Sequence, residues 1–172
     1  MYREEDSMLQ ISNRIRKVAC VTLLTTSAIQ MPTAEPNGFI KTLNNMGYMT
    51  STIDRFSAEF VGFSRQAPGP VLDIGAAYGI ATLEALKTGA KVVANDIEPQ
   101  HLEILRDRAP EADRGRLSLM PGAFPEGLAV EPGTLGAVLV CRVMHFFNGP
   151  RLEESARVLF RWLASGGKVF IV

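Results

Sequence analysis

Residues 71–82 read Val-Leu-Asp-Ile-Gly-Ala-Ala-Tyr-Gly-Ile-Ala-Thr. The run before Gly75 has the length of a buried strand, and a helix can open after Gly79, so the segment predicts a strand, a glycine turn and a helix. The two glycines let the backbone turn sharply and approach a ligand, and the first N–H groups of the helix are left to point at it. This stretch therefore indicates a ligand-binding turn in an α/β domain.

The residues inside the turn restrict the ligand. A Walker loop for triphosphates ends in Gly-Lys-Ser/Thr, whereas this turn continues without a lysine. A dinucleotide fingerprint reads G-x-G-x-x-G, whereas the glycines here are spaced G-x-x-x-G. Ala77 and Tyr78 put side chains beside the space that a pyrophosphate would take. A ligand that contains adenosine but no phosphate suits the turn better.

The turn resembles motif I of the class I S-adenosylmethionine-dependent methyltransferases, written roughly as D/E-x-G-x-G-x-G. The chain matches this motif at Asp73, Gly75 and Gly79, with Ala77 at the middle glycine. A second match follows a second apolar strand, residues 91–95. Asp96 at its end lies roughly twenty residues beyond the turn, where a carboxylate can accept hydrogen bonds from ribose hydroxyls.

Later segments extend the resemblance over about residues 69–172. Residues 116–120 match a short third strand, residues 135–146 match the fourth strand and its loop, and residues 161–172 match the L-x-P-G-G turn into strand five. Single positions depart from the family pattern. Gly122 and Gly136 stand where the family often has aspartate, and Ser165 replaces the proline.

The resemblance implies S-adenosylmethionine as the cofactor and S-adenosylhomocysteine as its product. It places the methionine end at residues 75–79, the ribose at Asp96, and the adenine at Ala123 and Phe124. The residues that it implies for cofactor binding are Asp73, Gly75, Ala76, Ala77, Tyr78, Gly79, Asp96, Ile97, Ala123, Phe124, Cys141 and Arg142.

Four of the candidate side chains have two interpretations each. Asp73 either orients the amino group of the cofactor or bonds the N–H groups of its own turn. Tyr78 either closes over the sulfonium or packs against the first helix. Arg142 either fixes an anionic acceptor or pairs with a surface carboxylate. His145, the candidate catalytic residue, either takes a proton from the acceptor or forms structural hydrogen bonds in its loop.

The composition is that of one ordinary globular domain, with 172 residues and 47% hydrophobic residues. Lys+Arg and Asp+Glu both number 18, so no overall charge attracts nucleic acid or an anionic membrane. Two cysteines and two histidines, His101 and His145, give neither a disulfide framework nor a metal site. We therefore expect a cytoplasmic protein with a small-molecule methyl acceptor and no nucleic-acid partner, membrane or metal.

The alternation of strands and helices after residue 69 predicts a doubly wound, Rossmann-like parallel sheet of the methyltransferase type, with helices on both faces. Its ligand is expected beyond the carboxyl ends of the strands. A helix over residues 151–164 is expected to bury one face. That face is Leu152, Ala156, Leu159, Phe160 and Leu163.

Three regions are expected along the chain. Residues 1–36 form an extension of uncertain structure, in which residues 18–28 imitate a secretory signal poorly and suit a packed helix or strand better. Residues 37–68 form an N-terminal helical extension over the cofactor, with helices at 39–49 and 52–63. Tyr48, Met49 and Arg55 are its candidates to face the pocket.

Residues 69–172 form the cofactor-binding core. This core is expected to be incomplete at its C-terminus, because residue 172 falls within strand five. A dimer, a swapped partner or the segment 18–26 could cover the apolar edge of that strand.

Three functions remain open from the sequence. The first is methyl transfer by in-line displacement at the sulfonium methyl to an unidentified acceptor. The second is a cofactor-binding protein that is inactive or regulatory. The third, and least favoured, is an NAD(P)-dependent oxidoreductase on a similar sheet.

Overall fold

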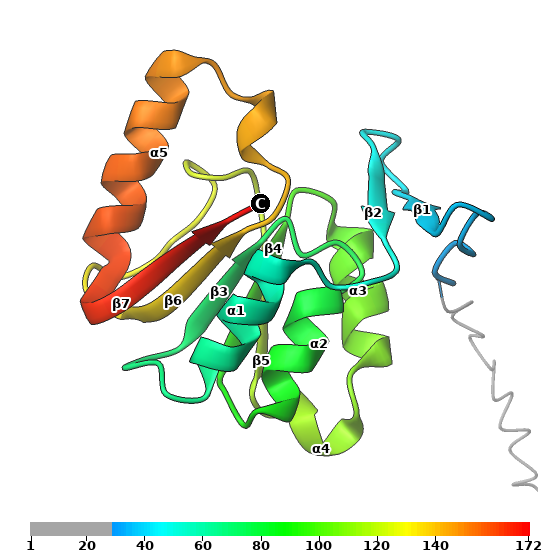
Figure 1. Cartoon of the computed structure of the whole chain (residues 1–172), viewed down its shortest axis with the longest axis horizontal. Helices are drawn as coiled ribbons and strands as arrows, with labels where there is room; N and C mark the ends of the chain where they lie inside the picture. The colour runs from blue at the N-terminus through cyan, green and yellow to red at the C-terminus, as the bar shows by residue number, and fades with distance from the viewer. Residues whose placement is uncertain (1–28) are drawn as a thin grey trace, which may run out of the picture.

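The computed structural model describes residues 29–172. Its centre is a five-stranded sheet in the order β5-β4-β3-β6-β7, in which all neighbouring strands are parallel (Figure 1). The strands are β3 Val71–Ile74, β4 Val92–Asp96, β5 Leu117–Pro121, β6 Leu135–Val140 and β7 Leu163–Ile171. The chain adds strands outward from β3 and then returns to β6 on its other side. The strand order therefore reverses between β3 and β6, where doubly wound sheets bind their ligands.

The helices cover both faces of this sheet, as the sequence predicts. They are α1 Arg55–Ser64, α2 Ile80–Lys87, α3 Pro99–Arg108, α4 Glu111–Arg114 and α5 Gly149–Trp162, with a 3-10 helix η1 Met144–Phe146. Phe60 of α1 and Leu86 of α2 pack with Val71 and Leu139, whereas Trp162 of α5 packs with Leu72 on the opposite face. Successive strand residues therefore point to opposite layers, and every residue of β3 and β6 is buried.

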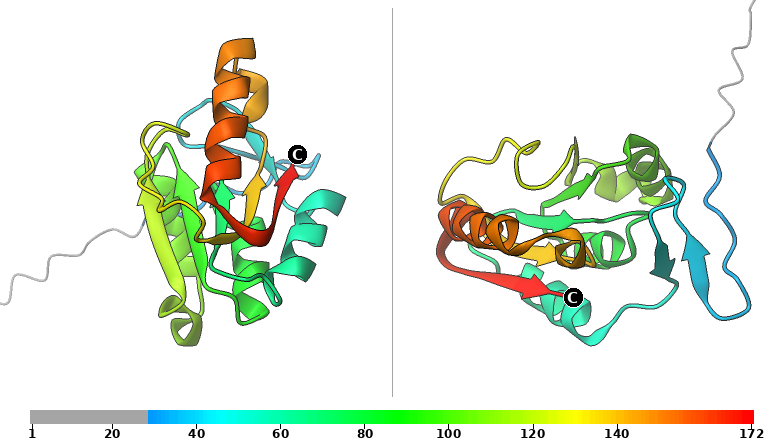
Figure 2. Two further views of the ribbon diagram at one scale, coloured as in Figure 1. Left: turned by 90° about the vertical axis from the view of Figure 1, so that its left-hand side faces the viewer. Right: turned by 90° about the horizontal axis from the view of Figure 1, so that it is seen from above.

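The expected helix at residues 39–49 is wrong. β1 Phe39–Lys41 and β2 Tyr48–Thr50 form an antiparallel hairpin, which Figure 2 shows beside the core. Ile40 and Met49 are buried while Phe39 and Tyr48 are exposed, so the pattern has the period of a strand. The turn between the strands contains Asn45 in a left-handed conformation with φ 56°, which a helix does not accommodate.

The second predicted helix of the extension is present and starts later than expected. It is α1, and Asp54 caps it by accepting hydrogen bonds from the N–H groups of Phe56 and Ser57. The N-terminal region is thus a hairpin followed by one helix. Residues 1–28 lie outside the described residues, and so does the expectation for residues 18–28.

The predicted buried face of α5 is partly wrong. Leu159 is buried as expected, but Leu152 is 40% exposed and Phe160 is 82% exposed. Val158 and Trp162 form the buried face instead, because the large indole fills the space over the sheet. Asn148 caps this helix as the sequence suggests, accepting a hydrogen bond from Arg151 N at 3.1 Å.

Both edges of the sheet are formed by strands with one neighbour among the described residues. β7 is the edge beside β6, and its Ile171 is 51% exposed. Pairing of this edge with a second chain stays a prediction. None of the helices within residues 29–172 combines the length and the apolar character needed to cross a membrane.

Candidate functional site

A cavity of about 360 Å³ opens at the carboxyl ends of β3, β4 and β6, where the strand order reverses. We call this the main cavity. A smaller cavity of about 40 Å³ lies beside it, and both are lined by Met49, Gly75, Ala77, Cys141 and Arg142. The predicted site residues on the main cavity are Gly75, Ala77, Asp96, Ile97, Ala123, Phe124, Cys141, Arg142 and His145. Asp73 and Ala76 line the smaller one. One sheet edge therefore collects most of the predicted site.

The glycine turn is built on left-handed backbone. Gly75, Ala77 and Gly79 have φ values of 77°, 45° and 83°. A Cβ atom on Gly75 would lie 2.7 Å from the carbonyl oxygen of Cys141, so glycine is required there for close approach as well as for conformation. Ala77 adopts the same region at the position of the family's middle glycine, and a hydrogen bond from its N–H group to Asp96 Oδ2 at 2.9 Å holds it.

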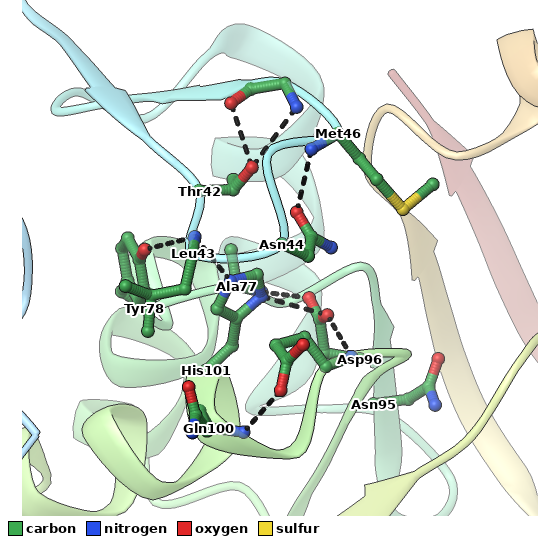
Figure 3. Close-up of polar contacts among 12 residues, drawn as sticks. Thr42, Leu43, Asn44, Met46, Ala77, Tyr78, Asn95, Asp96, Gln100 and His101 are labelled. Carbon is green, nitrogen blue, oxygen red and sulfur yellow. Dashed lines mark hydrogen bonds and ion pairs between the residues drawn. The ribbon is translucent and has the colours of Figure 1, made fainter.

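Asp96 connects the turn with the next helix (Figure 3). Besides the Ala77 N–H, its carboxylate accepts the Glu98 N–H at 2.9 Å and lies 3.0 Å from His101 Nδ1. The other ring nitrogen of His101, Nε2, accepts the N–H of Leu43 at 3.1 Å. These partners assign the His101 proton to Nδ1. Asp96 is therefore held from two sides before any ligand binds.

Sequence reasoning missed His101. The side chain is 1% exposed, lines the main cavity, and accepts a hydrogen bond from the hairpin at Leu43. Its position five residues after Asp96, at the start of a helix, was the available signal. The partner on its other nitrogen, Leu43, is 58 residues away in sequence and gave no local signal.

The Tyr78 side chain lies under the hairpin rather than on either cavity, which corrects its expected contact with the cofactor. Its ring is fully buried and meets His101 edge-on at 5.0 Å. The hydroxyl donates to the Lys41 carbonyl at 3.1 Å. It also accepts the Leu43 N–H at 3.1 Å (Figure 3). Tyr78 is thus an attachment point for the hairpin.

Gly79 also lines neither cavity. It is the N-cap of α2, and a Cβ atom there would lie 2.5 Å from Leu105 Cγ. Its role is to bring the turn against α3. Of the three residues expected from the extension, Tyr48 and Met49 line the main cavity. Arg55 does not, because its guanidinium pairs with Glu59 at 3.0 Å in solvent.

Asp73 is a buried carboxylate with one unused oxygen. Its Oδ2 accepts the hydroxyl of Thr82 at 2.6 Å, whereas Oδ1 has no hydrogen-bond partner among the described residues. Burial raises the pKa of Asp73 to about 6, and the negative charge of Asp96 acts in the same direction, while the Thr82 hydrogen bond opposes both. A buried oxygen without a hydrogen-bond donor is unusual, and a bound molecule with an N–H or O–H group would satisfy it.

Arg142 stands across the smaller cavity from the glycine turn. Its backbone is left-handed, with φ 53°, an uncommon conformation for a long side chain. The nearest polar contact is Thr50 Oγ1, 3.4 Å from Nη1. Within residues 29–172 no carboxylate lies within salt-bridge distance of this guanidinium, so its expected pairing with a surface carboxylate is not seen.

The far side of the main cavity is formed by the loop after β5. Asn95 Nδ2 donates to the carbonyl oxygens of Met120 at 2.7 Å and Gly122 at 2.9 Å, which fixes the loop that carries Ala123 and Phe124. Phe124 stacks on Phe147 with ring centroids 6.1 Å apart. The sequence predicts Asn95 only as part of a strand, because its hydrogen bonds depend on the neighbouring strand β5 and the loop after it.

Cys141 and His145 follow β6. Burial raises the pKa of the Cys141 thiol to about 11, so this cysteine is a small apolar wall residue. His145 lies in η1 on the main cavity with its ring centroid 4.0 Å from that of Phe146. No cluster of His, Cys, Asp and Glu within residues 29–172 is suited to a metal ion.

Comparisons with known proteins give the family of this chain. A family model described as a methyltransferase domain matches residues 71–167. The chain is 44% identical over 52 residues to the magnesium-protoporphyrin O-methyltransferase of Rhodobacter capsulatus, a match that covers 30% of this chain and 23% of that protein. It is 33% identical over 103 residues to an uncharacterized methyltransferase of Mycobacterium tuberculosis (strain ATCC 25618 / H37Rv), covering 59% of this chain and 38% of the relative.

The fold has solved counterparts. The glycopeptide N-methyltransferase MtfA in complex with S-adenosylmethionine superposes with a TM-score of 0.58 at 24% identity, over 67% of this chain and 51% of that one. The chain spans less than half the length of the curated relatives that it matches. The sheet order, the glycine turn and the match over residues 71–167 agree with one another. The chain belongs to the class I methyltransferase-domain family, whose cofactor is S-adenosylmethionine.

Proposed function

We propose that this chain transfers a methyl group from S-adenosylmethionine to a small-molecule acceptor at the edge where β3, β4 and β6 end. One observation carries the proposal. The unsatisfied Asp73 oxygen and the Arg142 guanidinium, which lacks a carboxylate partner among the described residues, both line the smaller cavity. An α-amino-acid end presents an ammonium and a carboxylate together. Those two groups would satisfy both side chains with charge-assisted hydrogen bonds.

The remaining parts of the cofactor suit the main cavity. Among the described residues, Asp96 Oδ2 accepts only the Ala77 N–H, so it keeps an acceptor position for a ribose hydroxyl. Ile97, which is 54% exposed, and the loop carrying Ala123 and Phe124 offer apolar surface to an adenine ring. Ala76 and Cys141 would act as walls of the methionine site, because neither brings a free polar side chain to it.

Positioning is the main task of the protein in this reaction. When bound, S-adenosylmethionine supplies an electrophilic methyl group, which leaves sulfur without its bonding electron pair and joins an acceptor atom in line with the breaking bond. Gly75 and Ala77, both on left-handed backbone, would hold the methionine end. The hairpin closes one side of the cavity through Met49 and Tyr48, which limits the access of water.

His145 is the group that we assign to proton removal. It lines the main cavity, and its ring lies against that of Phe146. A neutral imidazole nitrogen can accept the proton that a hydroxyl or amine acceptor loses as its heteroatom bonds to the methyl carbon. An acceptor that is already ionised would not need this step.

The nicotinamide alternative is less well supported. Ala77 carries its methyl group on left-handed backbone inside the turn, where a dinucleotide requires an open approach for pyrophosphate. Binding of S-adenosylmethionine without formation of S-adenosylhomocysteine in the presence of acceptors would instead indicate the inactive, cofactor-binding alternative.

Calorimetric titration with S-adenosylhomocysteine, S-adenosylmethionine and NAD(H) tests the proposal. We expect the first two to bind and NAD(H) not to bind, and we expect Asp73→Asn and Arg142→Gln each to weaken S-adenosylhomocysteine at least tenfold. Asp107→Asn is the control for charge, because Asp107 is exposed on α3 and pairs only with Arg106. Binding of NAD(H) alone would reject the proposal, and unchanged affinity in both site variants would reject the assigned methionine site.

A further inference from the structure

Exposed apolar side chains gather at the outer part of the main cavity. Met46 is 52% exposed, Tyr48 51% and Phe146 54%, and all three line this cavity. Figure 3 shows the Met46 side chain extending away from the polar network that holds the hairpin. Single exposed apolar residues are ordinary on a protein surface. Three from two separate elements around one opening indicate a surface that a ligand covers.

Two of the three charged groups on this cavity have partners in the structure, and the proposed function supplies one for the third, Arg142. Arg151 pairs with Glu126 at 2.7 Å, donates to the Phe124 carbonyl at 2.7 Å and lies over the Phe147 ring at 4.6 Å. Asp96 accepts two backbone N–H groups and faces His101. Arg142 also lines the smaller cavity, where in the proposed function its guanidinium binds the carboxylate of the cofactor. Among the described residues, this leaves no charge to neutralise a charged acceptor, and a charge buried without a partner is costly.

We infer that the methyl acceptor is an uncharged, apolar molecule that carries an aromatic ring. The ring would lie against Tyr48 and Phe146, with the Met46 sulfur at its edge, since thioethers and aromatic rings pack well together. His145, adjacent to Phe146, is placed to take the proton of the acceptor's hydroxyl or amine group. A bond between that heteroatom and the methyl carbon forms as the carbon–sulfur bond breaks, and sulfur keeps the electron pair. This inference rests on the proposed function.

Two probes with the same anilinonaphthalene skeleton test the inference. N-phenyl-1-naphthylamine is neutral, and 8-anilino-1-naphthalenesulfonate differs from it by one sulfonate group. Each is titrated by fluorescence into the full chain saturated with S-adenosylhomocysteine, after calorimetry has measured the affinity for that product. We expect the neutral probe to bind at least tenfold more tightly than the anionic one and to remain bound when the cofactor site is filled.

Variants locate the binding surface. Met46→Gln and Phe146→Gln are expected to weaken the neutral probe at least fivefold while the affinity for S-adenosylhomocysteine stays within twofold. Phe160→Gln is the matched control, because Phe160 is an exposed aromatic residue on α5 that lines neither cavity of the site. Tighter binding of the sulfonate, displacement of the probe by S-adenosylhomocysteine, or an equal loss in Phe160→Gln would overturn the inference. Failure to bind S-adenosylhomocysteine at all would instead overturn the proposed function.

Discussion

Lowering the pH from 7 to 5 is expected to weaken the binding of S-adenosylhomocysteine about tenfold, because Asp73 must be ionised to hold an ammonium group. A pKa of about 6 leaves about nine-tenths of the Asp73 side chains ionised at pH 7 and about one-tenth at pH 5. The amino group of the ligand stays charged over this range, since α-amino groups titrate near pH ~8. The affinity should therefore rise with pH up to about 6 and level off above it.

Calorimetry in two buffers with different ionisation enthalpies measures this effect directly. Binding at pH 5 should release about one proton, because the ligand's ammonium favours the ionised carboxylate, whereas binding at pH 7 should release almost none. Thr82→Val gives a sharper control. It removes the hydrogen bond that lowers the Asp73 pKa, so the midpoint should move to higher pH.

The Asp73→Asn variant should bind S-adenosylhomocysteine weakly, with an affinity that does not change between pH 5 and 7. Asp107→Asn should behave like the parent protein. If the parent affinity were flat over this range, or if Asp73→Asn kept the same slope, then Asp73 would not contact the ligand's ammonium and the assignment of the methionine site would be refuted.

Three further predictions concern the protein without ligand. The Asp73 pKa lies above its ordinary value of 3.8, so the stability associated with this group is greatest below pH 4 and is lost as the pH rises through about 6. Urea unfolding should show a loss of up to ~3 kcal/mol from this source between pH 4 and 7.5, reduced in Asp73→Asn, and an identical pH profile in the variant would contradict it. Tyr78→Phe removes the hydroxyl that contacts the hairpin backbone at Lys41 and Leu43 and should cost about 1–2 kcal/mol. Hydrogen exchange of residues 40–49 should then accelerate while β3 stays protected; unchanged exchange in the hairpin would argue against the attachment. Cys141, with a pKa of about 11, should react with iodoacetamide at pH 8 roughly a hundredfold more slowly than a thiol of ordinary pKa, measured in a Cys20→Ser background. A rate like that of a free thiol would show that the wall at Cys141 is open to solvent.

The parts of the site that could be predicted from sequence depend on neighbours along the chain. The turn at residues 75–79 follows from a strand, two glycines and a helix in immediate succession, and Asp96 follows from the end of the next strand. Those positions are set by local backbone geometry and by the order of elements in a parallel sheet. Gly75, Ala77 and Asp96 line the main cavity as expected, whereas Tyr78 and Gly79 line neither cavity.

The hairpin could not be predicted in the same way. Phe39, Leu43 and Met46 have a spacing that also suits a helix. The structure instead buries the middle residue of each three-residue strand, Ile40 and Met49. What holds the segment in place is a set of contacts from distant residues. Tyr78 and His101, 35 and 58 residues away in sequence, accept hydrogen bonds from the Leu43 N–H. Local patterns in a single sequence do not predict such distant pairs.

The imidazole of His101 fixes two things at once: the carboxylate assigned to the ribose, and the backbone of the hairpin that carries Met46 and Tyr48. The wall for the acceptor and the contact for the cofactor therefore cannot shift independently. Thermodynamic linkage makes the consequence quantitative. If an acceptor held by the hairpin raises the affinity for the cofactor by some factor, the cofactor must raise the affinity for that acceptor by the same factor.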